Sequence, residues 1–407
     1  MLKPDLINGG LDMPWKESSV MDQRHHFVLK AYKSQGNFTE LCRKFGVSTK
    51  TGYKWLKRFG ENGIAGLEDQ PRITKNNRNK TDVETQNRLL RLKEKHMAWG
   101  AKKIMVLYGR KYPGEYIPAR STVEELFKRE GYTKKKRRRA AKKHVRIQSK
   151  IKPTKPNELW TVDFKGWWWT SKKERCEPLT VRDEYSKYIL SIEVPEKGDT
   201  HHVKAVFEGL FRKYGLPEYI RSDNGPPFGN VLNMWGLTKL SVWWMSLGIK
   251  LDRSDPGHPE QNGAHERMHR DMMKELENKI YGDLRLHQKM FDRWRKEFNE
   301  IRPHEALGMK TPKELYTKSE RKYSGDEIEI EYNGRMKSRI VNDRGYFNYH
   351  RQRIFVGNPF AGYNVGIKEF VNKPIEVWFD NFKLGVIDLD TLQIQTDLLE
   401  LENKISC

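Results

Sequence analysis

Cysteine is scarce in this sequence, and its scarcity excludes two kinds of stabilisation. The three cysteines, Cys42, Cys176 and Cys407, lie far apart and form no Cys-x-x-Cys pair. Such spacing supports neither a disulfide framework nor a structural zinc site. The neighbouring histidines His25 and His26 have no paired cysteines after them at a suitable distance. We therefore expect reduced, inert thiols and no zinc module.

Long apolar runs are also lacking. No segment approaches the roughly 20 apolar residues of a membrane-spanning helix, and no basic amphipathic helix with a strongly apolar face stands out. The first residues, "MLKPDLINGGLDMPWKESS", do not have the basic-then-apolar layout of a secretion signal. We expect no membrane partner and a location inside the cell, in the cytoplasm.

Positive charge, in contrast, is abundant. The 407 residues include 77 Lys and Arg against 54 Asp and Glu, which gives a net charge of +23. An excess of this size predicts a polyanionic partner, and nucleic acid is the first candidate. The chain is too long for one ordinary core, so we expect a multidomain protein.

Residues 20–75 have the rhythm of a helix-turn-helix domain, after a tail over residues 1–19. In "LCRKFGVSTKTGYKWLKRF", Gly46 supplies the turn and Ser48 caps the next helix, although Gly52 weakens that helix by about 1 kcal/mol relative to Ala. The residues that this helix would present to a DNA major groove are Thr49, Lys50, Thr51 and Lys54. The alternative is a plain three-helix core with a solvated basic face.

Residues 76–133 repeat this layout, in "WGAKKIMVLYGRKY" and "IPARSTVEELFKREGY". The last helix of this second unit opens with Arg120, Ser121 and Thr122, which we expect to contact DNA. Two units in tandem would read two successive stretches of duplex and so raise specificity.

A basic linker follows over residues 134–156. Its segment "KKKRRRAAKKHVR" has nine Lys or Arg in thirteen positions, a density that cannot pack into a core. We expect Lys135, Arg137 and Arg138 to contact phosphates and to add salt-sensitive affinity. A localisation signal is the alternative interpretation.

Two further domains are indicated by changes of pattern. Residues 157–320 alternate strand-like segments with helices, which predicts a mixed α/β sheet domain. Residues 321–395 show short period-two pieces such as "RIFVG" and "IEVWFD", which predict a small β-barrel of about five strands. Residues 396–407 form a C-terminal tail.

Three acids in the α/β domain have positions that need an explanation. Asp163 sits within the apolar strand "LWTVDFKG", where a carboxylate is costly. Asp223 ends another strand, "YIRSDNGPPF", although Asn224-Gly225 also makes it a good turn residue. Glu266 lies on a helix predicted from about Gln261. Three carboxylates on two strands and a helix suit a pair of hard divalent cations, Mg²⁺ or Mn²⁺.

Other residues compete for roles at this site. Turn formation and solvated charge explain the acids Asp183, Glu184, Asp252 and Asp255. A zinc site would need the histidines His258, His265 and His269 plus ligands that the sequence does not show, and contact with DNA phosphates or local hydrogen bonding is the favoured interpretation of these histidines. Arg267 and Arg270 follow Glu266 and are candidates to hold a phosphate, or else belong to a charged helix surface.

The chain resembles the DDE transposase and retroviral-integrase superfamily, and more narrowly bacterial insertion-sequence transposases with an integrase-type catalytic core. The resemblance covers about residues 20–395, and the segments that carry it are "WTVDF", "RSDNGPPF", "PGHPEQNGAHERMHR" and "RPHEALGMKTPKELY". It implies a ribonuclease H-like core in which Asp163, Asp223 and Glu266 match the three metal-binding acids. The 42 residues between Asp223 and Glu266 exceed the usual family spacing, which an insertion at "NVLNMWGLTKLSV" would explain.

The resemblance also implies a function. It implies a bacterial transposase that binds the terminal inverted repeats of its element, cuts the ends to 3′-hydroxyls and joins them to target DNA with two metal ions per active site. At least a dimer is expected on double-stranded DNA, within the nucleoid. A structure-selective nuclease with the same core and a non-catalytic DNA-binding regulator are the alternatives.

Overall fold

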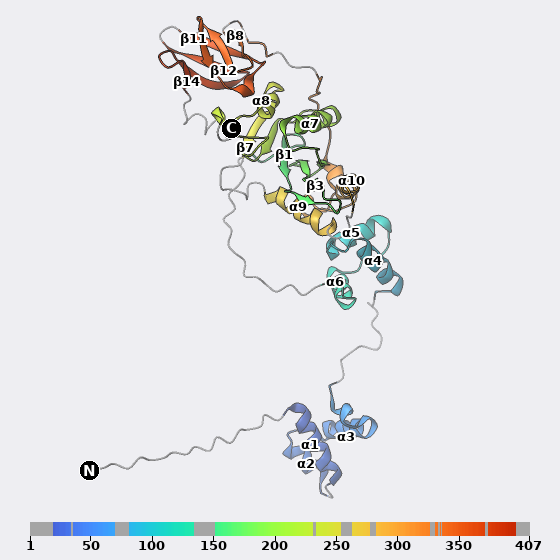
Figure 1. Cartoon of the computed structure of the whole chain (residues 1–407). Helices are drawn as coiled ribbons and strands as arrows, with labels where there is room; N and C mark the ends of the chain where they lie inside the picture. Colours follow the sequence, from blue (N-terminus) through green and yellow to red (C-terminus); the bar gives the residue numbers. More distant parts are fainter. Residues whose placement is uncertain are drawn as a thin grey trace, which may run out of the picture. The chain divides into compact units, whose positions relative to one another are not determined.

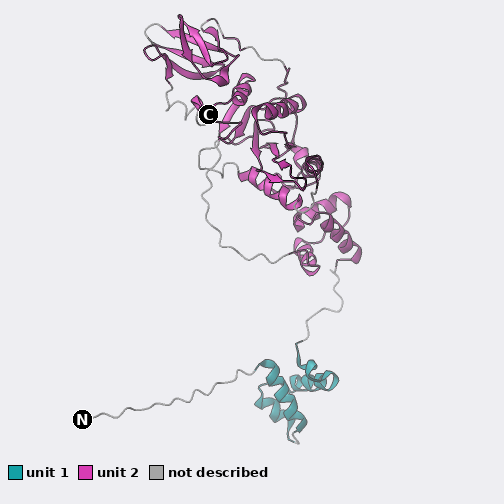
Figure 2. Cartoon of the chain, viewed as in Figure 1, with its two compact units in different colours: residues 1–80 teal, residues 81–407 magenta. Residues whose placement is uncertain are grey.

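The computed structural model describes residues 19–33, 36–69, 81–133, 151–230, 233–253, 263–276, 282–325, 330–332, 334, 336–370 and 373–395. The chain divides into two compact units, Met1–Lys80 and Thr81–Cys407 (Figure 2). Among the described residues, no helix combines the length and the apolar character needed to cross a membrane.

The first unit is a small helical domain (Figure 1). Its elements are α1 (Val20–Lys33), α2 (Phe38–Lys44), α3 (Thr49–Asn62) and the 3-10 helix η1 (Gly63–Leu67). Gly46 turns the chain between α2 and α3 with a φ of +65°, and the Ser48 hydroxyl caps α3 by accepting a hydrogen bond from the Thr51 N–H at 3.2 Å. These features are the predicted turn and cap of a helix-turn-helix.

Gly52 lies in the first turn of α3 and is buried where the helix packs against its neighbours. A Cβ atom at this position would lie 2.7 Å from Cys42 Sγ and 3.0 Å from a ring carbon of Phe27 and of Phe38. The glycine therefore weakens the helix locally but permits α3 to approach the core of Phe27, Val28, Cys42, Trp55 and Leu67.

The substitution Gly52→Ala is expected to destabilise the first unit, although alanine is the better helix former. Overpacking of a well-filled core typically costs about 1–3 kcal/mol, which exceeds the gain of about 1 kcal/mol in helix propensity. Thermal unfolding of the full chain, followed by circular dichroism, measures the shift of the first unit's transition.

Gly60→Ala is the matched control on the same helix. Gly60 is exposed, and an added Cβ would meet only the Tyr32 hydroxyl, at 3.4 Å. This variant should be as stable as the parent or more stable. Equal effects of the two substitutions would show that close packing does not explain Gly52.

The second unit opens with another three-helix bundle, α4 (Val83–Lys95), α5 (Ala101–Lys111) and α6 (Arg120–Arg129). Its core includes Leu89, Trp99, Ile104, Tyr108 and Phe127. This bundle occupies the predicted second helix-turn-helix segment, and α6 begins at Arg120 as the sequence indicates.

This bundle is joined by polar contacts to the domain that follows. His96 Nδ1 lies 2.8 Å from Glu297 Oε1, and Lys102 and Arg110 on α5 pair with Glu305 and Glu314 at 3.2 and 3.0 Å. All three contacts come from α5 and the end of α4. The start of α6 thus stays exposed to solvent.

The α/β domain is built on a five-stranded mixed sheet in the order β5-β4-β1-β6-β7. Its strands are β1 (Leu159–Phe164), β4 (Leu179–Asp183), β5 (Ile189–Glu193), β6 (Tyr219–Ser222) and β7 (Lys250–Arg253). β1, β6 and β7 run parallel, whereas β4 and β5 are antiparallel to their neighbours. A short hairpin, β2 (Trp168–Trp169) and β3 (Arg175–Cys176), lies between β1 and β4.

Helices cover the sheet through two separate apolar clusters. α7 (Thr200–Tyr214) and α8 (Lys239–Ser246) pack in a cluster with Trp160 and Val162 of β1. α9 (Gly263–Leu276) and α10 (Leu284–Glu300) pack in the other, with Ile189 and Ile192 of β5. The short helices η4 (Glu305–Leu307) and α11 (Pro312–Leu315) follow. This arrangement is the predicted α/β domain.

The C-terminal domain is a seven-stranded, nearly closed sheet in the order β8-β11-β12-β13-β14-β10-β9, in which β8 and β9 also lie near each other. The strands are β8 (Lys337–Ile340), β9 (Tyr346–Tyr349), β10 (Gln352–Phe355), β11 (Asn364–Phe370), β12 (Lys373–Phe379), β13 (Phe382–Asp388) and β14 (Gln393–Gln395). About five strands were expected. The structure has two more, and turns with positive φ at His350 and Arg351 and at Asp380 separate β9 from β10 and β12 from β13.

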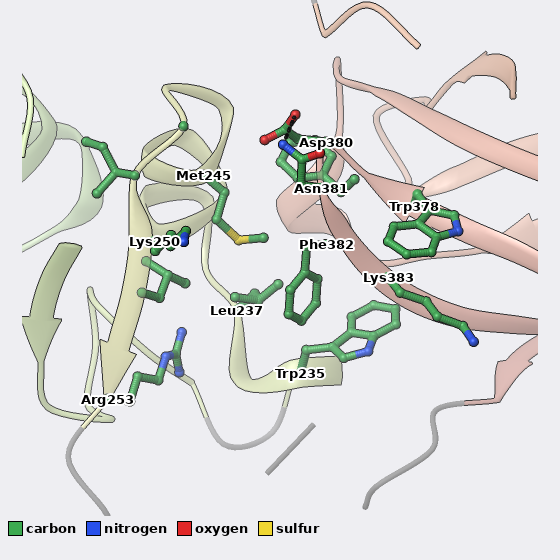
Figure 3. A pocket seen from close by; sticks show the side chains of 14 residues that line it. Trp235, Leu237, Met245, Lys250, Arg253, Trp378, Asp380, Asn381, Phe382 and Lys383 are labelled. Atoms are coloured by element: carbon green, nitrogen blue, oxygen red, sulfur yellow. Dashed lines mark hydrogen bonds between the residues drawn. The ribbon is translucent and has the colours of Figure 1, made fainter. Parts of the chain in front are cut away.

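The expected insertion at "NVLNMWGLTKLSV" attaches this sheet to the α/β domain. Trp235, in η2 (Met234–Gly236), donates its indole N–H to the Leu384 carbonyl at 2.8 Å, and Leu237 and Val242 are part of the C-terminal domain's apolar cluster. A cavity of about 410 Å³ lies beside this contact, between β7 and the β12–β13 hairpin (Figure 3).

Candidate active site

Asp163 and Asp223 lie at the same edge of the α/β sheet. Asp163 is near the end of β1, and Asp223 directly follows β6. The two strands are parallel neighbours, with Thr161 paired to Arg221, so continuing this register brings the two acids level. Carboxyl ends of adjacent parallel strands commonly form the binding edge of an α/β sheet.

Glu266 comes from α9, which packs over the end of the sheet. The negative charges of Asp223 and Glu266 both act on Asp163, whose pKa is raised to about 7, first by burial and then by these two neighbours. Burial also raises the pKa of Asp223, against the Gly225 N–H and the positive charge of Arg253. Glu266 itself is exposed. The charges of Asp223 and Glu266 are therefore close enough to affect the protonation of Asp163.

The donor chemistry of these acids suits a hard divalent cation. Carboxylate oxygens are the ligands that Mg²⁺ and Mn²⁺ prefer, and a cation's charge offsets the repulsion that raises the pKa of Asp163. Within the described ranges, however, no group of three or more His, Cys, Asp or Glu side chains is arranged to hold a metal ion. Asp163, Asp223 and Glu266 are thus near one another without enclosing a common point.

The Asp-Asn-Gly sequence after β6 serves as a turn as well. The N–H of Gly225 donates to the Asp223 carboxylate, and the Gly225 carbonyl accepts from Phe228 and Gly229. A turn held by its own first side chain places the Asp223 carboxylate at the strand end. The turn interpretation and the site interpretation are therefore compatible.

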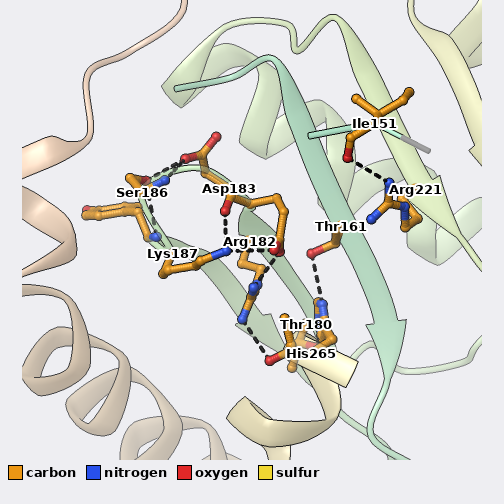
Figure 4. A network of polar contacts seen from close by, with 12 residues as sticks. Ile151, Thr161, Thr180, Arg182, Asp183, Ser186, Lys187, Arg221 and His265 are labelled. Atoms are coloured by element: carbon orange, nitrogen blue, oxygen red, sulfur yellow. Dashed lines mark hydrogen bonds and ion pairs between the residues drawn. The ribbon is translucent and has the colours of Figure 1, made fainter. Parts of the chain in front are cut away.

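A buried polar cluster attaches α9 to the sheet beneath Asp163. The Thr180 hydroxyl on β4 lies 2.6 Å from His265 Nε2 and 2.7 Å from His269 Nε2, and it donates to the Asp163 carbonyl at 3.0 Å. Thr161 Oγ1 lies 2.9 Å from His265 Nδ1 (Figure 4). These contacts fix the residues on either side of Glu266 against β1 and β4.

The number of available protons determines which nitrogen of each imidazole in this cluster is protonated. A hydroxyl has one proton, and Thr180 gives it to the Asp163 carbonyl, so both imidazoles donate from Nε2. His265 Nδ1 then accepts from Thr161. Burial, the largest cause, lowers the pKa of His265 well below its usual value and that of His269 to about 3, so both are neutral.

This cluster also answers the zinc alternative. Because Nε2 of both His265 and His269 is engaged by Thr180, neither nitrogen is available to a metal ion. The Nδ1 atom of His269 lies 3.9 Å from Asp163 Oδ2. His258, the third histidine of that alternative, lies outside the described residues.

The motif "RPHEALGMKTPKELY" braces the same helix from another side. Arg302 is buried and pairs with Asp271 and Glu275 of α9 at 2.7 and 2.9 Å. Thr311 and Glu314 form a capping box at the start of α11, which orders the end of the motif. The Glu266 helix is therefore held to the sheet through its own two imidazoles, which contact Thr161 and Thr180. The Arg302 guanidinium holds the same helix through its ion pairs.

The competing acids that the structure describes have local structural roles. Asp183 accepts hydrogen bonds from the N–H groups of Asn157 and Ser186, both at 2.7 Å (Figure 4). Glu184 pairs with Arg182 and Lys187. Asp183 pairs with Trp160 in the ladder, at the end of β1 away from Asp163.

Asp252 and Asp255 complete this set of competitors. Asp252 is buried and accepts from Arg221 Nε at 2.7 Å, so its charge is matched within the sheet. Asp255 lies outside the described residues.

The predicted DNA-contact residues are mostly exposed. On α3 and α6 these exposed residues are Thr49, Lys50, Lys54, Arg120, Ser121 and Thr122. Thr51 is half-buried, with its hydroxyl 2.9 Å from Ser48 Oγ. Arg267 and Arg270 are exposed on α9, and Lys135, Arg137 and Arg138 lie outside the described residues. Contact of these residues with DNA stays a prediction.

Thr161 and Thr180 were not found by sequence reasoning. Their signal was indirect: two histidines four residues apart on one helix face require polar partners on the surface that they cover. The strand "LTVRD" contained such a partner in Thr180, but only the strand pairing places it opposite Asp163.

Thr180→Val is expected to lower the free energy of unfolding of the second unit by about 2 kcal/mol or more. Valine keeps the shape but leaves two imidazole donors and one carbonyl without this partner, and each buried unsatisfied group costs about 1–3 kcal/mol. Urea unfolding of the full chain measures the loss. Thr161→Val, which removes one imidazole contact, should cost less, and the reverse order would contradict the assigned network.

Comparison with known proteins adds family matches to this geometry. The integrase core domain matches residues 153–259, which include Asp163 and Asp223, and a second integrase core family matches residues 247–312, which include Glu266. A helix-turn-helix domain matches residues 27–72, and a homeodomain-like domain matches residues 51–127.

Similar proteins include two from insertion elements. The insertion element IS407 uncharacterized 31.7 kDa protein of Burkholderia multivorans is 27% identical over 197 residues, which cover 48% of this chain and 68% of that protein. The insertion element IS476 uncharacterized 39.2 kDa protein of Xanthomonas euvesicatoria is 24% identical over 226 residues, covering 55% of this chain and 62% of that protein. The second match thus spans less than two thirds of its relative.

A solved structure with a similar core is the HTLV-2 integrase catalytic core domain in complex with magnesium, at 21% identity and a TM-score of 0.33, covering 41% of this chain and all of that one. The integrase core matches contain all three acids, and the helix-turn-helix matches precede them in the chain. The chain belongs to the DDE transposase and integrase superfamily, within the polynucleotidyl transferases, and has a ribonuclease H-like integrase core.

Proposed function

We propose that this protein is the transposase of an insertion sequence. It binds the terminal inverted repeats of its element, cuts each end to a 3′-hydroxyl and joins that end to target DNA. The observation that carries this proposal is the position of Asp163 and Asp223 at the ends of neighbouring parallel strands, with Glu266 near enough for its charge to act on Asp163.

In this proposal Asp163, Asp223 and Glu266 would hold two Mg²⁺ or Mn²⁺ ions. Such ions would activate a water or a 3′-hydroxyl on one side of a phosphodiester and stabilise the leaving oxygen on the other. Asp163 supplies a fixed carboxylate, since its strand is buried and paired on both sides. Glu266 is positioned through the contacts of its neighbour His265 with Thr161 and Thr180.

Basic residues around the acids would hold the DNA. Arg267 and Arg270 are exposed on the Glu266 helix and are assigned to phosphates next to the cut. Both chemical steps are in-line displacements at phosphorus, so no nucleophilic serine or tyrosine is required and no covalent protein intermediate forms.

Recognition of the element ends is assigned to the paired helix-turn-helix units. The helix-turn-helix and homeodomain-like matches, the net charge of +23 and the exposed starts of α3 and α6 support a duplex DNA partner. Two ends must be processed together, so we propose at least a dimer on DNA, in the bacterial cytoplasm and associated with the nucleoid.

The two alternatives predict different products and different residues. A non-catalytic regulator would not need the acids, whereas all three are present. A structure-selective nuclease would cut but would not join ends, and it would not need two exposed recognition helices. Pre-cut ends incubated with Mg²⁺ and a target plasmid separate the two enzymes, because only a transposase gives strand-transfer products.

Asp223→Asn is expected to abolish cutting of element ends while leaving end binding within about threefold. Bound metal ions would supply several kcal/mol of transition-state stabilisation, and each 1.36 kcal/mol corresponds to a tenfold change in rate. The cleavage rate should therefore fall by about a thousandfold. Cleavage of a labelled end fragment in Mg²⁺ and a gel-shift assay measure the two effects.

Asp292→Asn is the control for this experiment. Asp292 lies on α10 and pairs with Arg295 of the same helix at 3.4 Å, so the substitution leaves the contacts of the Glu266 helix in place. Its cleavage rate should stay near that of the parent. Cleavage retained by Asp223→Asn would refute the site, and a footprint on DNA flanking the gene would supply the end sequence.

A further inference from the structure

The β2–β3 hairpin continues directly from the strand that carries Asp163. Asp163 pairs with Thr180 and Phe164 with Leu179 in the β1–β4 ladder, and the Lys165 N–H donates to the Pro178 carbonyl at 3.0 Å just beyond them. The hairpin therefore extends from the same sheet edge as the acids.

Three consecutive tryptophans in this hairpin alternate between its two faces, as strand geometry requires. Trp168 is half-buried against α10, with its ring edge-on to Phe291 at 6.3 Å. Trp167 and Trp169 point the other way and are 52% and 61% exposed. Their ring centroids lie 5.5 Å apart at an interplanar angle of 74°. Two large aromatic side chains thus form one shared exposed surface. Exposed apolar residues that are scattered singly are ordinary, whereas adjacent ones mark interaction sites.

This exposure is built into a braced element. Ser171 Oγ accepts from the Gly282 N–H at 2.7 Å, and Glu174 accepts from the Leu284 N–H at 3.0 Å. Lys172 pairs with Asp283 at 3.1 Å. The hairpin is held to the start of α10 by these contacts, so the exposed face has a defined position.

A cation lies beside one of the two exposed rings. The Arg175 guanidinium carbon lies 5.2 Å from the Trp167 ring centroid and also pairs with Glu177 at 2.7 Å, and Lys165 and Lys173 lie next to the hairpin strands in the sequence. Aromatic rings beside cations are the combination by which proteins bind unpaired nucleic acid, since bases stack on the rings and the backbone meets the charges.

We propose that Trp167 and Trp169 form a stacking platform for unpaired bases of the DNA strand next to the cleaved phosphate. This inference rests on the proposed function, because that function brings a DNA end to Asp163. Trp167 is four residues after Asp163, a reach of at most about 13 Å along an extended chain. At about 3.4 Å per nucleotide, this reach corresponds to the first four or so nucleotides from the cut.

The test compares forked and fully paired DNA with the full-length protein. Two fluorescein-labelled duplexes of equal length, one with several unpaired thymidines at an end, are titrated in EDTA and read by anisotropy. Trp167→Ala combined with Trp169→Ala should weaken binding of the forked duplex by roughly tenfold or more, because stacking on an aromatic ring contributes that much per base. Binding of the paired duplex should change less than about twofold, since the helix-turn-helix units are untouched.

Two further variants make the result specific. Trp167→Phe combined with Trp169→Phe keeps aromatic faces and should bind forked DNA within about threefold of the parent. Tyr185→Ala removes an exposed aromatic side chain just after β4, at the end of the β1–β4 pair away from Asp163, and should bind both duplexes as the parent does.

Several outcomes would overturn the platform. Unchanged binding of the forked duplex by the alanine variant, or an equal loss for both duplexes, excludes stacking on these rings. An altered oligomeric state in sedimentation with unaltered forked-DNA affinity would make the face a contact between copies of the chain. The binding assay needs no cleavage, so a failure of the transposase assignment would show separately. In that case the parent protein would give no strand transfer, although its preference for forked DNA would still depend on the two tryptophans.

Discussion

The repulsion that Asp223 and Glu266 exert on Asp163, near the end of a buried strand, is the constraint on which the rest of this structure depends. Asp163 is partly buried and senses both Asp223 and Glu266, which raises its pKa to about 7. Acids in this situation separate unless other contacts hold their elements in place. β1 and β6 are fixed by their ladder, whereas α9 is fixed by polar side chains, through Thr180 on the sheet and through Arg302 beyond it. These polar contacts add to the apolar packing of α9 against Ile189 and Ile192 of β5.

Within the second unit, the helical bundle and the C-terminal domain attach to this core and leave the start of α6, a predicted DNA contact, exposed. The second helix-turn-helix bundle is held through ion pairs from α5 and the end of α4, and the start of α6 faces solvent. The long segment between Asp223 and Glu266 contributes Trp235, Leu237 and Val242 to the contact with the C-terminal sheet. The unusual length of this segment is therefore explained by domain attachment, and it need not disturb the grouping of the acids.

Features set by local chemistry could be predicted from the sequence, and features set by packing could not. The Ser48 cap, the Gly46 turn and the start of α6 at Arg120 depend on neighbouring residues and match expectation. The alternation of the tryptophans also follows from strand geometry. In contrast, the reason for Gly52 is its approach to Cys42, and the role of Thr180 depends on histidines 85 and 89 residues away. The seven strands of the C-terminal sheet depend on positive-φ turns at non-glycine residues.

The proposed function requires Asp163, Asp223 and Glu266 to bind a shared pair of cations. Anomalous diffraction from crystals of the DNA-bound protein grown with Mn²⁺ is the decisive measurement, because it locates the ions without relying on activity. We expect two manganese peaks roughly 4 Å apart, with oxygens of all three acids at about 2.2 Å from one or the other, near the distances of hard-cation ligands. Manganese bound at other residues, or a pair of ions that any one of the three carboxylates does not contact, would contradict the proposed function.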